Sequence, residues 1–550
     1  MQRFSYDAGD PVFDLDGWRV SAQVITFENA YGLDPAKTAV EATAAGWRIC
    51  AAGLTWAGGQ ETSAGSIALD IERRPDGLQI VVEARHPRTI RCTKLVLSGL
   101  PRGAVLARGW AEEEVPASGV IYEYPGGPKL AGQPINVLAS PLAFVRPSDG
   151  GPWIAARSRD ECVRAKRIAV YPVGDALTVE LIHEEAAPAM GTGGVTPPWR
   201  IERTRVPDAV VRDHIAHVAR AFGLLPWEER ADVPPWAREI ALVAALHGMH
   251  WSGYVFNTYD QMLDALRWIA AQIEGGRVLA YLPGWEGRYY WQYGDYRPDA
   301  RLGGSDGFAR LATGAHALGV HLMPMFGAHS ANTAAPNFEH WGEPARLRTA
   351  GGYVEQGNKP DWDGSRAHDP AWQAILNPGA PTWRRHLCDQ ISAMVEAYDL
   401  AGDAIFLDTT HWWQNDPQHP VYEGLVALRD ELKARFPNLL VAGEGWYDAL
   451  GAVTPVSHSM VPARWAEEAF APFNRTFAHL STGDPSRGST GVHELGYQQF
   501  QLAPLARHRW PTVTIVDGTV ARAPDGVAAV IRQAREYADR FLAPSARAER

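Results

Sequence analysis

The sequence predicts an N-terminal β-sandwich followed by a (β/α)8 barrel of the TIM type, within a chain of 550 residues. Up to about residue 204, short alternating runs are separated by glycine, proline and aspartate turns without intervening helices, which is typical of a sandwich. From about residue 238, apolar runs alternate with segments of helical period, as in a parallel barrel. The length also favours more than one domain, or a barrel with a large attachment.

We assign residues 1–205 to the sandwich. The acidic residues of this part fall in turns or at strand positions that are expected to point outward. A solvated face is therefore expected there rather than a catalytic group. Residues 206–236 form a connector, in which proline-bearing junctions flank an amphipathic helix expected at 208–222. The clearest strands of the sandwich are expected at 18–27, 66–71, 78–84, 94–97, 120–124 and 176–183.

The barrel is assigned to residues 237–545, with about eight strands as the (β/α)8 pattern requires. An open doubly wound sheet is the alternative, but neither a GxGxxG turn nor a GxxxxGK[ST] loop supports nucleotide binding. Strands are expected at 240–246, 278–282, 320–325, 404–407, 439–442, 457–461, 490–495 and 511–516. Helices are expected at 259–273, 306–318, 381–398, 422–436, 464–480 and 525–542.

The composition excludes several classes of protein. The formal charge of −11 and the pI near 5.9 argue against a nucleic-acid partner. Four cysteines without CxxC spacing predict free thiols in a reducing compartment. The sequence has neither an apolar run of about 18 residues nor a signal-peptide pattern, so we expect no membrane association and a cytoplasmic location. The oligomeric state stays open, a homodimer included.

The stretch 404–446 carries the strongest functional pattern. Two apolar runs joined by a helix end in Asp408 and Glu444, and neighbouring parallel strands lie about 4.8 Å apart. The carboxylates can then approach the separation of about 5–5.5 Å used by retaining glycoside hydrolases. We predict Asp408 as the nucleophile. Glu444, with a longer side chain and with Trp446 nearby to limit its hydration, is predicted as the acid/base, and no cofactor is required.

Aromatic and polar residues follow the other strands and predict a carbohydrate substrate. Tryptophan is frequent, at 21 residues, and flat aromatic rings stack on the apolar faces of sugars. The histidines are expected to bond sugar hydroxyls rather than a metal, and a long insertion at 329–380 to form part of the cleft wall. The predicted substrate-binding residues are Trp285, Glu286, Trp291, Asp295, His329, Asn332, His411, Trp412, Trp446, His458, His493 and Glu494.

Asp408 in AIFLDTTHWW, followed by Glu444 in VAGEGW, resembles the retaining α-glycosidases of the α-amylase type. In those enzymes the strand-four aspartate is the nucleophile and the strand-five glutamate is the acid/base. The preceding β-domain more closely resembles the α-galactosidase, α-glucosidase and endo-α-N-acetylgalactosaminidase families. The resemblance implies a retaining hydrolase of α-linked sugars. The chain departs from the α-amylase pattern at Phe406, where an arginine is expected, and in having only His493-Glu494 or Asp517 late in the barrel.

Two other classes stay open. A metal-dependent amidohydrolase also places strand-end histidines in a barrel, and this chain has His247 and His250 after the first strand. That chemistry would need two histidines at alternate positions and further ligands on the middle strands, where Asp408 and Glu444 stand instead. A non-catalytic carbohydrate-binding protein would keep the aromatic residues without needing the carboxylate pair.

Overall fold

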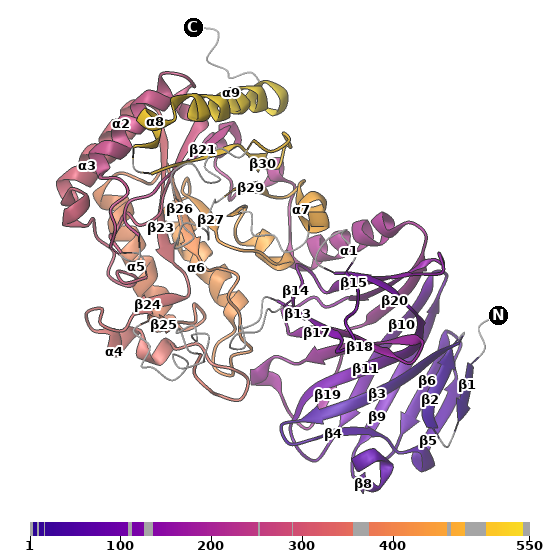
Figure 1. Ribbon diagram of the computed structural model, residues 1–550. Helices are drawn as coiled ribbons and strands as arrows, with labels where there is room; N and C mark the ends of the chain where they lie inside the picture. The colour runs from indigo at the N-terminus through magenta and orange to yellow at the C-terminus, as the bar shows by residue number, and fades with distance from the viewer. Residues whose placement is uncertain are drawn as a thin grey trace.

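The computed structural model describes residues 4–7, 10–15, 17–107, 113–125, 136–250, 253–288, 290–355, 373–458, 464–478, 502–516 and 518–542. Figure 1 shows a β-rich N-terminal part beside a barrel surrounded by helices, with α1 between them. Within those ranges, every helix is too short or too polar to cross a membrane.

The N-terminal part is a sandwich of two large sheets, as predicted. Side chains alternate along the strands, so that Val20, Ala22 and Val24 of β3 and Leu78 and Ile80 of β10 fill the core between the sheets. The 11-stranded sheet contains β1 (Phe4–Asp7), β2 (Asp10–Leu15), β3 (Trp18–Thr26), β4 (Ala30–Leu33), β7 (Leu54–Trp56), β8 (Glu61–Ser63), β11 (Ile90–Pro101), β13 (Val120–Tyr124), β14 (Asn136–Val137), β17 (Lys166–Val173) and β18 (Ala176–Glu184). The 9-stranded sheet contains β5 (Thr38–Ala42), β6 (Gly46–Ala51), β9 (Ser66–Arg74), β10 (Gly77–Arg85), β12 (Gly103–Leu106), β15 (Leu142–Pro147), β16 (Trp153–Ser158), β19 (Gly193–Val195) and β20 (Trp199–Thr204).

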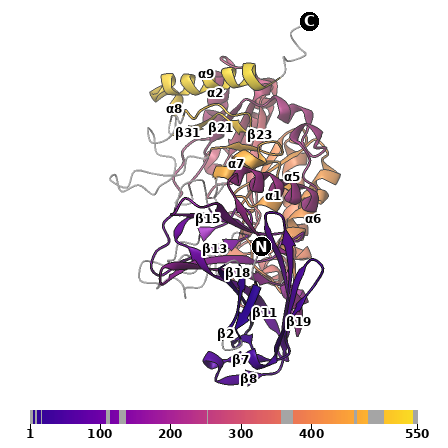
Figure 2. The ribbon, with the colours of Figure 1, turned by 90° about the vertical axis from the view of Figure 1, so that its right-hand side faces the viewer.

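The connector helix α1 (Pro207–Phe222) follows β20 directly. It starts at a proline, whose missing N–H is not needed in the first turn, and it ends at Gly223, which adopts a φ of 67°. Its buried face packs in one hydrophobic cluster with residues of the sandwich and of the barrel. The turned view in Figure 2 shows α1 close to α7 (Arg464–Phe470), above the sandwich.

The second part is a ring of parallel strands, and it has nine strands rather than the eight expected. The extra strand arises at Pro511, which has no N–H to donate and divides the last segment into β30 and β31. β30 pairs with β29 and β31 pairs with β21, so the divided segment closes the ring. The strands are β21 (Leu242–Leu246), β22 (Val278–Leu282), β23 (His321–Gly327), β26 (Ala404–Asp408), β27 (Leu440–Gly443), β28 (Val456–His458), β29 (Arg475–Phe477), β30 (Arg509–Trp510) and β31 (Thr512–Ile515).

The helices around the ring lie close to their predicted positions, and Figure 1 shows them on its outer side. They are α2 (Tyr259–Ala270), α3 (Gly304–Ala317), α5 (Pro381–Ala397), α6 (Val421–Arg435) and α9 (Pro524–Phe541). The short helix α8 (Thr519–Arg522) was not predicted. The insertion after β23 adds α4 (Phe338–Trp341) and a small antiparallel pair, β24 (Ser330–Asn332) and β25 (Gln373–Ile375).

One helix prediction is wrong in its second half. The helix expected at 464–480 ends at Phe470, and Arg475–Phe477 is strand β29. The Asn474 side chain donates to the backbone oxygens of Thr454 (3.1 Å) and Pro455 (3.3 Å), which draws the chain beside β28. The strand expected at 490–495 lies outside the described residues.

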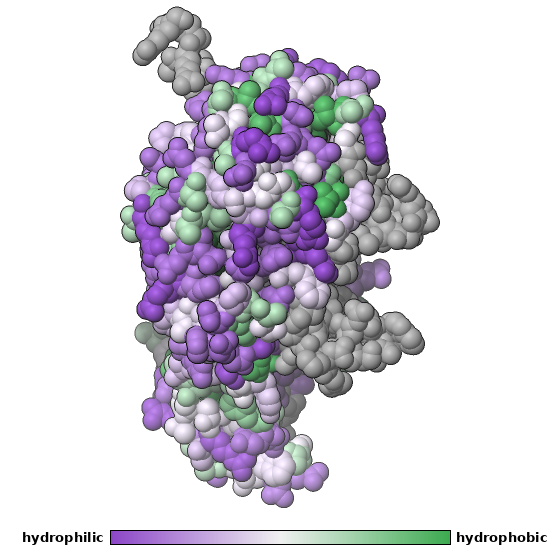
Figure 3. Space-filling model, turned by 90° about the vertical axis from the view of Figure 1, so that its left-hand side faces the viewer, coloured by the Kyte–Doolittle hydropathy of each residue, from purple (hydrophilic) through white to green (hydrophobic). Residues whose placement is uncertain are grey.

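The surface and the cysteines agree with the composition. Polar residues predominate on the face shown in Figure 3, with apolar residues in small scattered groups. All four cysteines lie in the described ranges and carry free thiols, as predicted; Cys92 and Cys388 are buried, and Cys162 is exposed.

Candidate active site

Asp408 and Glu444 stand together at the carboxyl ends of two adjacent strands. β26 and β27 are parallel, with Leu407 paired to Gly443, and the Glu444 N–H donates to the Leu407 carbonyl at 2.8 Å. The Thr409 N–H then donates to Glu444 Oε2 at 3.0 Å. The sheet pairing therefore continues past both strand ends and brings the two carboxyl side chains to the same edge.

The two carboxyl groups interact directly. Burial raises the pKa of Asp408 well above its ordinary range, and the charge of Glu444 and a hydrogen bond with its carboxyl raise it further. The Tyr293 hydroxyl, 2.7 Å from Asp408 Oδ2, and His411 act in the opposite direction. Asp408 is 4% exposed, whereas the Glu444 side chain is 21% exposed. Asp408 therefore keeps its proton to a higher pH than an exposed aspartate does.

The loops that follow the two strands interlock. Thr410 Oγ1 donates to the Glu444 carbonyl at 2.6 Å, and His411 Nδ1 lies 3.2 Å from the same oxygen. A Cβ at Gly445 would lie 2.1 Å from His411 Nδ1, so only glycine permits this approach. Thr409, a β-branched residue, has a φ of 61°. Backbone strain of this kind concentrates at functional sites and persists because the surrounding contacts enforce it.

Tyr293 is a site residue that the sequence analysis did not identify. It follows β22, is fully buried, and donates its hydroxyl hydrogen to Asp408. A Cβ at Gly327, the last residue of β23, would lie 2.3 Å from the Tyr293 ring. A glycine at the end of a strand indicates that another group packs closely there. The sequence alone does not identify Tyr293 as that group.

Several predicted binding residues do lie near the carboxyl pair. His458 Nδ1 is 4.0 Å from Glu444 Oε1, and His411 contacts the Glu444 backbone. His329 is fully buried, which lowers its pKa to about 3, and its Nδ1 donates to the Leu376 carbonyl at 3.1 Å. His329 is therefore neutral and can offer one polar ring nitrogen.

Glu286 is the most unusual of these side chains. It is buried, and neither carboxyl oxygen has a hydrogen-bond partner among the described residues. Burial and the charge of Asp408 raise its pKa well above the ordinary value. A carboxyl in such surroundings is a neutral acid that can donate one hydrogen bond and accept another.

Two of the predicted tryptophans lie in packed clusters. Trp285 is fully buried between Phe308 and Phe326, and its indole N–H donates to the Met325 carbonyl at 2.9 Å. Trp446 packs edge-on against Phe470, with ring centroids 4.5 Å apart. Both rings are thus engaged in packing rather than presented to a ligand.

The remaining predicted residues shape the surrounding loops. Trp291 lies under Arg288 at 4.4 Å, and its carbonyl accepts from Asn332 Nδ2 at 2.9 Å. Asp295 pairs with Arg297, and Trp412 packs half-buried against the core. His493, Glu494 and Asp517 lie outside the described residues.

The two histidines after the first strand pack against the same aromatic ring. His247 and His250 each contact Phe256 edge-on, with ring centroids 6.0 Å apart. Across the described ranges, His, Cys, Asp and Glu side chains form no group of three suited to a metal ion. No observation in this part of the chain therefore favours the amidohydrolase alternative.

The fold is shared with solved glycosidase structures, although no protein-family model and no curated relative matches the sequence. Alpha-N-acetylgalactosaminidase NagBb from Bifidobacterium bifidum aligns with a TM-score of 0.68 at 16% identity, over 98% of this chain and 94% of that chain. The galactosidase domain of alpha-galactosidase-sucrose kinase, AgaSK, aligns with a TM-score of 0.51 at 13% identity, over 98% and 74%. The alpha-galactosidase from Lactobacillus brevis gives 0.50 at 12%, over 98% and 71%. These similarities concern the fold, and they agree with the predicted β-sandwich followed by a barrel.

Proposed function

We propose that the protein is a retaining glycoside hydrolase acting on an α-linked sugar, with Asp408 as nucleophile and Glu444 as acid/base. The observation that carries this proposal is the placement of Asp408 and Glu444 at the ends of adjacent strands, where the Thr409 N–H also bonds the Glu444 carboxyl. Inverting enzymes separate their carboxyls by about 6.5–9.5 Å to admit a water molecule. Carboxyl groups on neighbouring strands, which lie about 4.8 Å apart, support instead the separation of about 5–5.5 Å that retaining enzymes use.

The geometry suits a double displacement. Asp408 attacks the anomeric carbon while Glu444 gives its proton to the departing glycosidic oxygen, leaving a glycosyl ester on Asp408. Glu444, now ionised, takes a proton from water, whose oxygen attacks the anomeric carbon and releases Asp408. The Tyr293 hydroxyl stabilises Asp408 in its ionised form before the attack and after the release. This sequence of steps requires Asp408 to be ionised and Glu444 to be protonated when the substrate binds.

Galactose-type sugars are the first substrates to test. The aligned structures are titled alpha-N-acetylgalactosaminidase and alpha-galactosidase. From these titles, α-galactosides and α-N-acetylgalactosaminides form the substrate class proposed here.

The test is a panel of p-nitrophenyl α- and β-glycosides of galactose and N-acetylgalactosamine, with NMR of the first anomer released. We expect turnover of an α-glycoside with the α-anomer as first product. Glu444→Ala should lose turnover and regain it with azide, as an α-glycosyl azide, because azide can attack the β-linked Asp408 ester without a general base. A β-anomer as first product would refute retention. Near-normal turnover in Asp408→Asn would refute the assignment of the nucleophile.

A further inference from the structure

The loop that carries Glu444 is bound to the N-terminal sandwich. Asp448, four residues after Glu444, is buried; its Oδ1 accepts from the Tyr124 hydroxyl at 2.6 Å and its Oδ2 from the Ser140 hydroxyl at 2.5 Å. Its own N–H donates to the Ala139 carbonyl at 2.8 Å. Three bonds from the sandwich thus converge on one residue of the barrel.

A histidine of the connector completes this group. His214 of α1 lies 2.6 Å from Ser140 through Nε2, and both residues are buried. Ser140 donates its single hydroxyl hydrogen to Asp448, so His214 is the donor to Ser140. Burial lowers the pKa of His214 well below its ordinary value, which keeps the ring neutral. The combination of serine, histidine and aspartate is therefore a structural link and not a hydrolytic triad, in which serine would donate to histidine.

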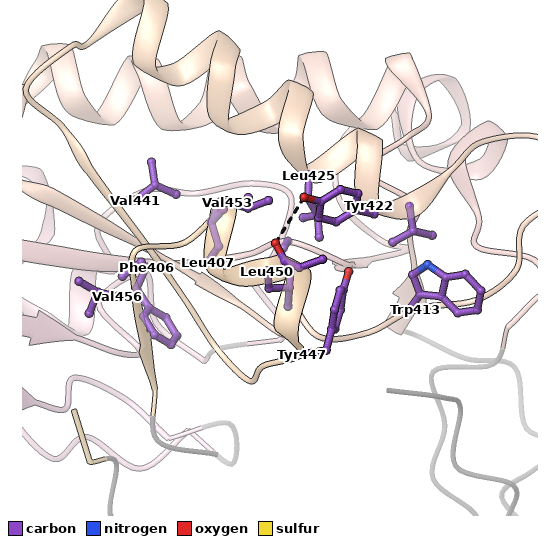
Figure 4. Close-up of a cluster of buried hydrophobic side chains, with 14 of the residues drawn as sticks. Phe406, Leu407, Trp413, Tyr422, Leu425, Val441, Tyr447, Leu450, Val453 and Val456 are labelled. Carbon is purple, nitrogen blue, oxygen red and sulfur yellow. Dashed lines mark hydrogen bonds between the residues drawn. The ribbon is translucent and has the colours of Figure 1, made fainter. Parts of the chain in front are cut away.

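The residues between Glu444 and Asp448 are fixed in the same way. Trp446 belongs to a hydrophobic cluster shared by the sandwich (Leu106, Phe144), α1 and α7. Tyr447 packs edge-on against Tyr124 at 6.0 Å. Figure 4 shows Tyr447 and Leu450 beside Tyr422 of α6, whose hydroxyl donates to the Ala449 carbonyl at 3.3 Å. The loop is thus held by the sandwich on one side and by the barrel on the other.

The loop that follows Asp408 has its own contact with the sandwich. Asn415, seven residues after Asp408, is buried and uses its whole amide group. Its Nδ2 donates to Glu184 Oε1 and to the Glu185 carbonyl, both at 2.8 Å, and its Oδ1 accepts from the Ala187 N–H at 2.7 Å. These partners lie at and just beyond the end of β18.

We propose that the N-terminal sandwich positions both catalytic carboxyl groups, holding Glu444 through Asp448 and Asp408 through Asn415. The inference rests on the proposed function. A displacement of about 1 Å at a reacting group can reduce a rate about 100-fold, and loops hold a position less firmly than strands do. The buried bonds to the sandwich supply the missing restraint, so Asp448 and Asn415 are positioning residues that act through their neighbours.

Substrates with different leaving groups can distinguish the role of Asp448 from that of Asn415. Glu444 is needed to protonate an alkyl or sugar leaving group, but a dinitrophenolate leaves without a proton. We expect Asp448→Asn to lower kcat/KM about 100-fold for a sugar leaving group, as a displaced acid would, and far less for a dinitrophenyl glycoside. Asn415→Ala should lower kcat/KM equally for both substrates, because Asp408 must attack the anomeric carbon whichever group departs.

Asp403→Asn is the matched control. Asp403 is also a buried aspartate with three donors, but it precedes β26 at the opposite end of the barrel. The Asp403→Asn variant should have a lower unfolding temperature but an unchanged ratio of kcat/KM between the two leaving groups. Tyr124→Phe and Ser140→Ala each remove one donor to Asp448 and should shift that ratio by less than Asp448→Asn does. They test the positioning role if Asp448→Asn fails to fold.

The outcomes separate the two proposals. A wild-type protein that turns over α-glycosides, together with folded Asp448, Tyr124 and Ser140 variants that leave the leaving-group ratio unchanged, would overturn the positioning role alone. A wild-type protein with no turnover of any glycoside would overturn the proposed function and this inference with it.

Discussion

Two aspartates at opposite ends of strand β26 have contrasting surroundings. Asp403, before the strand, accepts hydrogen bonds from His316 Nε2 (2.7 Å), His321 Nδ1 (3.3 Å) and the Leu322 N–H (3.1 Å). Asp408, at the end of the strand, has one donor in Tyr293 and a second carboxyl as its neighbour. Both are buried. The aspartate at one end of the strand is thus stabilised by hydrogen-bond donors, and the aspartate at the other end is repelled by a second carboxylate.

The difference separates stability from chemistry within a single strand. A buried carboxylate with several donors stabilises the folded state, whereas the buried Asp408, with a second carboxyl and a strained Thr409 beside it, destabilises that state. The carboxyl end of the barrel is therefore the part where removing a charge should leave stability intact and abolish activity. The amino end should show the reverse.

The largest effect is expected from Asp408→Asn. Loss of the nucleophile should lower kcat/KM by on the order of 10⁴-fold or more, while the unfolding temperature stays equal or rises because a like-charge contact is removed. Steady-state kinetics and calorimetry on the same preparation measure both quantities. A large drop in the unfolding temperature would remove the contrast with Asp403.

Tyr293→Phe should give the next largest effect. A hydrogen bond to a charged group contributes about 1.5–3 kcal/mol, which corresponds to about 10–100-fold in rate. Because the hydroxyl lowers the pKa of Asp408, its removal raises that pKa further. A higher pH is then needed to ionise the nucleophile, so the acidic limb of the kcat/KM profile should move to higher pH. An unchanged acidic limb would contradict the role given to Tyr293.

Asp403→Asn should change stability and leave chemistry intact. The amide cannot accept all three donors, so we expect the free energy of unfolding to fall by about 1–3 kcal/mol. Denaturant titration measures the loss, and kcat should stay near the wild-type value. A loss of activity at a temperature where the variant is folded would show that the two ends of β26 are coupled.

The smallest effect concerns pH and His316. The hydrogen bond to Asp403 raises the pKa of His316 above its ordinary value. The resulting stabilisation is fully present below the unfolded pKa of about 6.5 and is lost as pH rises through the folded pKa. His316→Gln should therefore lower the unfolding temperature at about pH 5.5 more than at about pH 8.5. The exposed His340 provides a control, since His340→Gln should change neither value.

The sequence was sufficient where the information is local. Strands buried on both faces appear as continuous apolar runs, and β26 and β27 each carry a carboxylate at or directly after their last residue. Their identity, the helix between them and their adjacency followed from residues 404–446 alone. The barrel and the sandwich followed from the change in periodicity near residue 238.

The sequence was insufficient where distant segments meet. Tyr293 is 115 residues from Asp408, and Tyr124 is 324 residues from Asp448, and no pattern in the sequence joins those positions. Trp446 is two residues from Glu444 in the sequence. This short separation does not reveal that the Trp446 ring packs against the sandwich. The residues of β29 lie in a stretch with a helical period. They form a strand because they pair with β28.

The closing of the ring by residues 509–515 has a consequence for synthesis of the chain. β21, the first strand of the ring, obtains its second neighbour only when β31 is made, about 270 residues later. At about 5–20 residues per second, roughly 15–55 s of translation separate the two strands. For that time β21 keeps an apolar edge with open backbone groups, the kind of edge that pairs with foreign strands. The barrel is therefore most exposed to misassembly while it is still attached to the ribosome.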